Sequence, residues 1–483
     1  MSSAPIGRGR RWCIFLVGLL ESLLFGGTIF GWAQLAYVLK EQGIFSHLCN
    51  ATSTSRASSD VDVSFKGCAE QDETFAFIYT IACTVYSTPG ILLGYMLHHL
   101  GLAVTRVSGG LMLTSGFLCL GQVSKESPNW LYPAMILLSL GGNQLRMSGL
   151  QFGNLFPRYR STAISLISGV FSASAGLFFF LQLAVDAGIS LRHANWVLAG
   201  MASLTLPLTV MMPCHHIPYN DDAAAEKSDR ENVGLPLRTS FLSLSSFTYQ
   251  LWFFVNLFSI VLFNTFFNSW ISSISSTVDE AWVFSSLFSV AAFVSPFISP
   301  LPGIAMDLLK KRKLEGLSST ERRIQEMRSP ALPSLVQTGL VAVLYTCLFF
   351  ESAAAVYLAL VCLMLARPSV IAIGNSFVRA RFPGDHFHRL IGIYGTIVSV
   401  LTILQYPHFL WAQQDYNGAQ GFIIAMLIVS SAQPLHLLSD TYLRKVVHME
   451  QTTLSDETTV PLSEVCEKKP EVVRSSADPP QPA

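Results

Sequence analysis

The chain has 483 residues, of which 51% are apolar and only 13% are charged, and its mean hydropathy is +0.45. These values leave too few polar side chains to cover a soluble globule of this length, so most of the surface is expected to face lipid. Thirty-one basic and thirty-one acidic residues cancel to a net charge of zero, and no basic face of the kind that binds nucleic acid accompanies the apolar stretches. The composition therefore indicates a lipid bilayer, and not a nucleic acid, as the partner.

Hydropathy predicts an all-α membrane protein with twelve transmembrane helices. Each apolar stretch is close to the roughly 20 residues that an α-helix needs to cross the hydrocarbon core. The predicted spans are 12–32, 74–97, 103–123, 131–151, 161–185, 190–212, 247–271, 281–306, 331–350, 354–377, 390–411 and 418–438.

Basic residues set the predicted orientation, because Lys and Arg accumulate on the side that is not translocated. With both termini cytoplasmic, most basic residues outside the spans fall inside the cell, and Arg106, near the start of the third span, is grouped with them. The basic residues left outside are Lys40, Arg56, Lys66, Lys125 and Arg192. We therefore expect both termini in the cytoplasm and a multi-pass protein.

The first span carries a carboxylate at mid-depth. Glu21 stands about nine residues into the span, which places it near mid-depth because a helix rises about 1.5 Å per residue. Phe25 lies one turn further on the same face. A charge at the centre of a membrane helix costs about 2.5 to 3.5 kcal/mol on insertion scales, so it needs a reason to be there. Glu21 and Phe25 are candidate substrate-binding residues. Proton-coupled transport through Glu21 remains an alternative to uncoupled transport.

The loop at residues 40–73 is predicted to be exoplasmic. Cys49 and Cys68 bracket most of it, and the sequon Asn50-Ala51-Thr52 lies between them. Disulfides and N-glycans both form outside the cytosol. We therefore expect a disulfide between the two cysteines and glycosylation at Asn50.

A repeat a little over 200 residues long links the two halves of the chain. Span four ends in RMSGLQFGNLF, starting at Arg146, and span ten ends in RPSVIAIGNSF, starting at Arg367, so that Arg, Ser, Gly, Asn and Phe recur in one register. The repeat predicts an N-terminal six-helix bundle and a C-terminal one. The predicted domains are 1–212, a cytoplasmic linker at 213–246, the second bundle at 247–440 and a disordered tail at 441–483.

The repeat also covers the ends of spans two and eight, where Gly94 and Gly303 open the segments GYMLH and GIAMD, the second ending at Asp307. Two halves in parallel repeat resemble the major facilitator superfamily, in which substrate sits between the halves. The two segments resemble the Gly-x-x-x-Asp-(Arg/Lys) loop of that superfamily, although His98 and Leu308 depart from it. Gly94, Gly303 and Asp307 are therefore candidate gating residues.

Two arginines occupy equivalent positions inside the spans. Arg146 and Arg367 lie near mid-depth, and Pro368 breaks the helical hydrogen bonds beside the second. One alternative pairs an arginine with Glu21 or with backbone carbonyls. The other places both arginines on the wall of a cavity, where they orient a polar ligand, and Pro368 favours this alternative at Arg367.

Amide and aromatic side chains complete the candidate substrate site. They are Asn143, Gln144 and Gln151 in span four, and Asn264, Phe267 and Asn268 in span seven. Amides can read the edge of a neutral heterocycle, and aromatic rings can stack on its face. The alternative at each amide is a hydrogen bond that holds two helices together.

No motif for other chemistry is present in the sequence. It has no Gly-x-x-x-x-Gly-Lys-(Ser/Thr) loop, no His-Glu-x-x-His and no metal-ligand spacing of Cys and His. We expect no enzyme activity, no cofactor and no metal.

Several segments resemble one solute carrier family. They are 18–22, 30–32, 48–49, 150–156, 160–162, 188–192, 216–219 and 382–387. The family contains the sodium-independent large neutral amino acid transporters three and four and the equilibrative nucleobase transporter, and the chain is most similar to the nucleobase branch through 150–151, 188–192 and 216–219.

This resemblance implies bidirectional, sodium-independent transport of purine nucleobases (adenine, guanine, hypoxanthine) at the plasma membrane. We also expect the protein to be a monomer and a facilitator, since Glu21 is the one carboxylate placed deep in a span. The first alternative is facilitated transport of large neutral amino acids, for which Glu21 and Arg367 could pair with the ammonium and the carboxylate. A second alternative is a membrane receptor or scaffold that transports nothing.

Overall fold

The computed structural model describes residues 8–49, 68–88, 90–156, 160–212, 237–299, 301, 318–382 and 384–448. These residues form helices and connecting turns without a strand. Nine helical segments among them are long and apolar enough to cross a membrane. Helices also cover the three other predicted spans, where α3 and α4, α6, and α9 and α10 lie.

The N-terminal half is a bundle in which several helices are broken. Its elements are α1 (Arg8–Phe25), η1 (Thr28–Gly31), α2 (Trp32–Glu41), η2 (Ser46–Leu48), α3 (Ala69–Ser87), α4 (Gly90–His99), α5 (Gly101–Leu120), η3 (Pro128–Trp130), α6 (Leu131–Leu150), η4 (Gln151–Leu155), α7 (Arg160–Ala173), η6 (Ser174–Gly176), α8 (Leu177–Asp186), α9 (Leu191–Ser203) and α10 (Thr205–Val210). The first predicted span therefore continues as far as Glu41.

The C-terminal half contains longer continuous helices. Its elements are α12 (Leu237–Phe241), α13 (Leu244–Ile274), α14 (Val278–Ile298), α16 (Ser319–Arg328), α17 (Ala331–Cys347), α18 (Ala353–Arg381), α19 (Gly384–Leu401), η7 (Thr402–Leu404), α20 (Gln405–Gln414), α21 (Tyr416–Ser430) and α22 (Ala432–His436). Pro368 lies inside α18 without ending it, which is tolerated because other groups of the bundle can satisfy the freed carbonyl.

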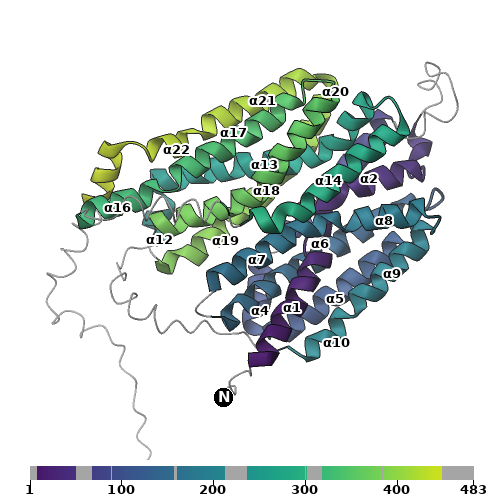
Figure 1. Ribbon diagram of the computed structural model, residues 1–483, viewed down its shortest axis with the longest axis horizontal. Helices are drawn as coiled ribbons and strands as arrows, with labels where there is room; N and C mark the ends of the chain where they lie inside the picture. Colours follow the sequence, from purple (N-terminus) through teal and green to yellow (C-terminus); the bar gives the residue numbers. More distant parts are fainter. Residues whose placement is uncertain are drawn as a thin grey trace, which may run out of the picture.

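Figure 1 shows the two halves as neighbouring bundles, coloured from purple through blue to teal for the first and from teal through green to yellow for the second. At their boundary α14 packs against α7, η6 and α8, and α13 packs against α2. Gly169 of α7 allows this close approach, because a Cβ there would lie 2.8 Å from the Cα of Pro296.

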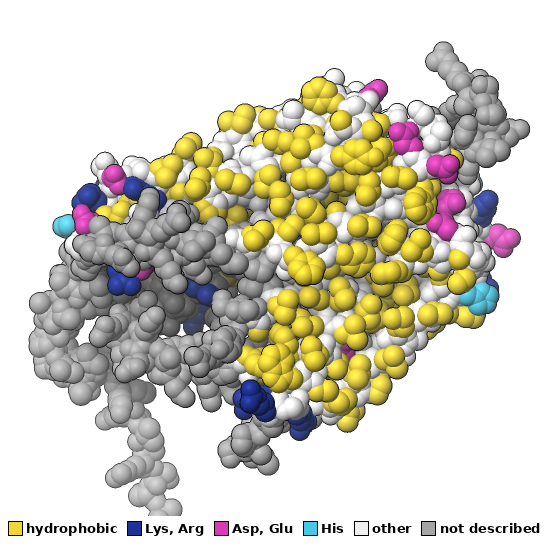
Figure 2. All heavy atoms as spheres, viewed as in Figure 1, with side chains coloured by type: hydrophobic (Ala, Val, Ile, Leu, Met, Phe, Trp, Pro, Cys, Tyr) yellow, Lys and Arg dark blue, Asp and Glu magenta, His cyan; other side chains and the backbone are white. Residues whose placement is uncertain are grey.

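The surface between the two ends of the molecule is apolar. Figure 2 shows hydrophobic side chains over the middle of the face, with charged side chains mainly at the ends. Leu16, Leu111, Phe180, Phe297 and Val361 are all about half exposed or more. Such a belt would be unstable in water, and it fits the hydrocarbon core of a bilayer.

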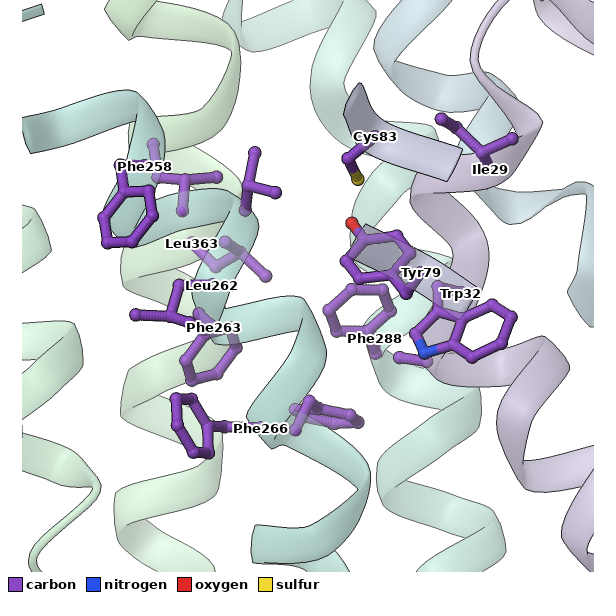
Figure 3. Packing of buried hydrophobic residues seen from close by; sticks show 14 of the residues in the cluster. Ile29, Trp32, Tyr79, Cys83, Phe258, Leu262, Phe263, Phe266, Phe288 and Leu363 are labelled. Atoms are coloured by element: carbon purple, nitrogen blue, oxygen red, sulfur yellow. The ribbon is translucent and has the colours of Figure 1, made fainter. Parts of the chain in front are cut away.

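The buried core runs across the boundary between the halves. Trp32 of α2 stacks on Tyr79 of α3 with ring centroids 5.5 Å apart. Phe288 of α14 lies beside them (Figure 3) and packs 4.7 Å from Phe267 of α13. Aromatic packing therefore joins helices that are far apart in the sequence.

Candidate functional site

Two broken helices meet at the centre of the N-terminal half. The first break follows Phe25, where Gly26 and Gly27 separate α1 from η1, and the second is η6, which contains Ser174. Tyr86 Oη donates to Gly26 O at 2.8 Å, and Gly27 N donates to Ser174 Oγ at 2.7 Å. Irregular backbone at membrane depth needs such partners, and side chains supply them here.

Three aromatic rings surround these breaks. Phe30 of η1 lies edge-to-face with Tyr86 of α3, with centroids 5.2 Å apart, and 6.1 Å from Phe171 of α7. Tyr86 and Phe171 are 6.4 Å apart and close to parallel. Gly27 is required at this point, because a Cβ would lie 2.6 Å from the ring of Phe171.

The two equivalent arginines converge on the same three rings. The guanidinium carbon of Arg146, in α6, is 5.1 Å from the ring centroid of Phe171 and 5.9 Å from that of Tyr86. The guanidinium carbon of Arg367, in α18, is 5.4 Å from the ring centroid of Phe30. These distances are in the range of cation–π contacts. We call the group Phe30, Tyr86, Arg146, Phe171 and Arg367 the arginine–aromatic site.

Neither guanidinium of the site has a carboxylate partner in the part of the chain that the structure describes. The ion pairs found there join Lys40 to Asp72, Arg106 to Glu21, Arg322 and Arg323 to Glu326, and Arg328 to Asp440. Nε of Arg146 is buried and has no hydrogen-bond partner. A guanidinium is a donor without an acceptor, so the site offers unneutralised donors next to stacking surfaces.

Glu21 has a different partner from the two that the sequence suggested. Its Oε2 accepts from Arg106 Nη2 at 2.5 Å, and the two residues are 4% and 1% exposed. The hypothesis that Arg146 or Arg367 pairs with Glu21 is therefore wrong.

The sequence also grouped Arg106 with the cytoplasmic basic residues, and the structure buries its side chain inside the N-terminal half. It lies within α5 with its guanidinium carbon 5.4 Å from the ring centroid of Phe152, in the same half as Glu21. Near the end of a span, hydropathy does not separate an arginine in solvent from one that turns inward to a partner.

The amides of span four divide between the site and helix packing. Asn143 Nδ2 donates to the backbone O of Tyr86 at 2.6 Å, so it supports an aromatic residue of the site. Gln144 Oε1 instead accepts from Ser108 Oγ at 2.7 Å and joins α5 to α6. Gln151 lies in η4 and is 7% exposed.

The amides of span seven cross between the halves. Asn264 Nδ2 donates to Tyr79 Oη at 3.1 Å, and Asn268 Nδ2 donates to Ala33 O at 2.7 Å. Tyr79 lies on the face of α3 that also carries Tyr86, seven residues further along the helix. Asn264 therefore adjoins the site through Tyr79, while Asn268 fastens α13 to α2.

The two predicted phenylalanines pack away from the arginines. Phe25 lies 6.0 Å from Phe117 of α5, and Phe267 lies 5.8 Å from Phe263, in its own helix. Both are nearly inaccessible to solvent. The structure assigns them to core packing.

A disulfide joins Cys49 to Cys68, and we call this end of the molecule the disulfide end. Asn50, Gly303 and Asp307 lie outside the described residues, and Gly94 lies within α4.

Hydrogen bonds between the halves gather towards the disulfide end. The bonded pairs are Asn264 with Tyr79, Asn268 with Ala33, Ser269 with Asp72, Trp282 with Asp186, Ser289 with Gln34, Tyr406 with Glu73 and Gln413 with Ala69. These hydrogen bonds join the halves at this end. Within the N-terminal half, Lys40 Nζ lies 2.6 Å from Oδ1 of Asp72, the carboxylate that Ser269 contacts from the other half.

The sequence does not single out the three rings of the site or the pairing of Arg106. Phe30, Tyr86 and Phe171 are indistinguishable by hydropathy from many other aromatic residues in the spans. The pair Gly26-Gly27 is the signal that was available, because adjacent glycines weaken a helix and allow close approach of other groups.

Comparison with known proteins is consistent with this architecture. Residues 69–406 match the sequence model of the Major Facilitator Superfamily. Equilibrative nucleobase transporter 1 of Bos taurus is 26% identical over 454 residues, which cover 86% of this chain and 92% of that protein. Large neutral amino acids transporter small subunit 3 of Homo sapiens is 29% identical over 218 residues, which cover 44% of this chain and 39% of that protein.

Solved structures share the fold at low sequence identity. A D-xylose-proton symporter aligns with a TM-score of 0.59 at 13% identity, covering 89% of this chain and 99% of that one. The nucleoside transporter NupG aligns with a TM-score of 0.54 at 12% identity, covering 88% and 100%. The family resemblance predicted from the sequence is thus confirmed, and the chain belongs to the Major Facilitator Superfamily, an all-helical fold of membrane transporters.

Proposed function

We propose that the chain is a facilitative, sodium-independent transporter of purine nucleobases such as adenine, guanine and hypoxanthine. The observation that carries the proposal is the arginine–aromatic site, where residues of both halves meet on three rings. The similarity to a nucleobase transporter over 86% of the chain supports it.

The chemistry of the site suits a planar heterocycle. Phe30, Tyr86 and Phe171 offer ring faces on which a base can stack. Arg146 and Arg367 offer N–H donors to the oxygen and nitrogen acceptors on its edge. Because the donors come from different halves, a bound base would contact both.

The proposed topology is twelve transmembrane helices in two six-helix halves, with both termini in the cytoplasm. The proposed location is the plasma membrane. The disulfide end then faces outward, since disulfides form in oxidising compartments. The hydrogen bonds between the halves would close the outer side. Transport then requires these bonds to break as the halves rock about the site.

The ion pair of Glu21 supports an uncoupled carrier. Among the described residues, the carboxylate of Glu21 is paired with Arg106 inside one half, and neither arginine of the site is paired with a carboxylate. Proton-coupled carriers use intramembrane carboxylates as relays. A proton relay through Glu21 would first have to break a buried ion pair.

Transport of large neutral amino acids is the second candidate, which the similarity to an amino acid transporter favours. An arginine could bind the carboxylate of such a substrate. Its ammonium group would be neutralised best by a carboxylate, and the described part of the site supplies none. The buried oxygens of Asn143 and Asn264 offer it only uncharged acceptors. The nucleobase is therefore the better fit.

Uptake measured side by side tests the proposal. Cells expressing the chain are given radiolabelled hypoxanthine, adenine or leucine, with sodium and with sodium replaced by choline, and surface protein is measured by biotinylation. We expect purine uptake above vector-only cells that does not depend on sodium. Leucine uptake without purine uptake would support the second candidate, and surface protein without any uptake would support a receptor.

A further inference from the structure

We propose that the arginine–aromatic site prefers purines with an oxygen at carbon 6 over purines with an amino group there. The preference rests on the proposed function, since it concerns which purines the same site takes. It concerns a choice between hypoxanthine or guanine on one side and adenine on the other.

The positions of the arginines are the first step. Arg146 lies over the rings of Phe171 and Tyr86, and Arg367 lies over the ring of Phe30. The three rings are within 6.4 Å of one another. A base that stacks on any of them would therefore place its edge within reach of a guanidinium.

The direction of the hydrogen bonds is the second step. A guanidinium has five N–H donors in a planar fork and no acceptor. In a 6-oxopurine O6 and N7 are neighbouring acceptors, and this edge matches the fork with two parallel bonds. In adenine the amino group at carbon 6 is a donor beside N7, so one arm of the fork would face an N–H group.

The unpaired amide oxygens are the third step. Oδ1 of Asn143 and Oδ1 of Asn264 are buried without a hydrogen-bond partner. The Nδ2 atoms of the same amides bond to Tyr86 O and to Tyr79 Oη, both on α3. These oxygens are acceptors close to the site. A 6-oxopurine has an N–H at position 1, whereas adenine has a bare nitrogen there that accepts.

The absence of a compensating acid is the fourth step. No ion pair of the described residues neutralises Arg146 or Arg367. The field at the site is therefore positive. A carbonyl oxygen stabilises two facing cations better than an amino group, whose hydrogens carry positive partial charge.

Competition for uptake tests the preference. Uptake of radiolabelled hypoxanthine is measured against unlabelled hypoxanthine and unlabelled adenine in cells expressing the full chain. We expect the half-inhibiting concentration of adenine to be about tenfold higher, which is the lower part of the range for one bidentate guanidinium contact. Arg367→Lys keeps the charge and removes the fork, so we expect the ratio to fall to about 2 or less in this variant.

A variant on the surface is the matched control. Arg322→Lys, in an exposed i,i+4 pair of α16, should leave the ratio unchanged. If Arg367→Lys transports nothing, stabilisation of the purified wild-type chain by each purine in a thermal-shift assay gives the same ratio without transport.

The outcomes separate the two proposals. Equal affinity for the two purines, or tighter binding of adenine, would overturn the preference and leave the proposed function standing. Wild-type protein at the cell surface that takes up neither purine would overturn both.

Discussion

Two kinds of buried arginine occur in this membrane protein, one paired with a carboxylate and the other packed against aromatic rings. Arg106 lies within one half, is 1% exposed and bonds to Glu21 at 2.5 Å. Arg146 and Arg367 come from opposite halves and lie against aromatic rings, with no carboxylate partner among the described residues. The first arrangement satisfies a charge inside one rigid body, and the second leaves donors available where two bodies meet.

The comparison explains why depth in the membrane does not define a substrate site. The sequence placed Glu21 deeper in the membrane than any other carboxylate. Its ion pair with Arg106 neutralises the charge that made it a candidate. Arg146 and Arg367 stay candidates because no carboxylate of the described residues neutralises them. In this chain the partner of a charged side chain, and not its depth, therefore separates the two cases.

Glu21→Gln should have the largest effect on stability. It leaves the charge of Arg106 uncompensated, and breaking a buried ion pair in this way costs about 3 to 5 kcal/mol. We expect less folded protein and a lower thermal midpoint by size-exclusion chromatography after heating. The double variant Glu21→Leu/Arg106→Met is the control and should recover most of the loss, because it replaces both charges with apolar groups. A normal midpoint together with abolished uptake in Glu21→Gln would instead assign Glu21 to transport.

Arg367→Gln should have the largest effect on transport without a loss of stability. It removes a charged donor from the site, and a hydrogen bond to a charged group contributes about 1.5 to 3 kcal/mol, so purine uptake at low concentration should fall at least tenfold. The thermal midpoint should stay level or rise, because an uncompensated charge is removed. Arg322→Gln on α16, an exposed position, is the control. Equal losses of midpoint and uptake in Arg367→Gln would reduce Arg367 to a structural residue.

Asp72→Asn should have an intermediate effect by weakening the disulfide end. The carboxylate of Asp72 contacts Lys40 Nζ at 2.6 Å within the N-terminal half, and it accepts from Ser269 Oγ of the C-terminal half at 2.8 Å. Its loss should favour the outward-open form by about 1 to 2 kcal/mol.

The measurement for this prediction is the reaction rate of a cysteine introduced at Ala33 with a membrane-impermeant maleimide. We expect this rate to rise several-fold in Asp72→Asn. Asp279→Asn, an exposed acid at the same end, should leave the rate unchanged. A rate that does not rise would mean that the hydrogen bond between Ser269 and Asp72 is no part of the closure.

Gln144→Leu should have the smallest effect. Gln144 bonds to Ser108 within the N-terminal half, so its loss should cost about 1 kcal/mol of stability and leave uptake unchanged. Uptake and thermal midpoint are measured as above. Asn143→Leu is the contrasting variant, because Asn143 supports Tyr86 of the site and its loss should reduce uptake. Loss of uptake in Gln144→Leu as severe as in Arg367→Gln would return Gln144 to the substrate site.

The sequence by itself determined the membrane environment, the division into two related halves and the two equivalent arginines. Hydropathy and the repeat depend only on the order of residues, and Arg146 and Arg367 follow from the shared register of the segments that they open. The family resemblance could be recognised in the same way, because short segments keep their order and spacing. These features need no knowledge of which helices are neighbours.

Only the tertiary structure decided which buried side chains contact one another. Hydropathy gives the depth of a side chain and not the direction in which it points around its helix, so the sequence could not place Glu21 against Arg106 or Gln144 against Ser108. The aromatic part of the site depends on the breaks at Gly26-Gly27 and at Ser174, which bring Phe30, Tyr86 and Phe171 together. Those contacts join residues more than 50 positions apart, and the packing of whole helices, which no local pattern encodes, sets them.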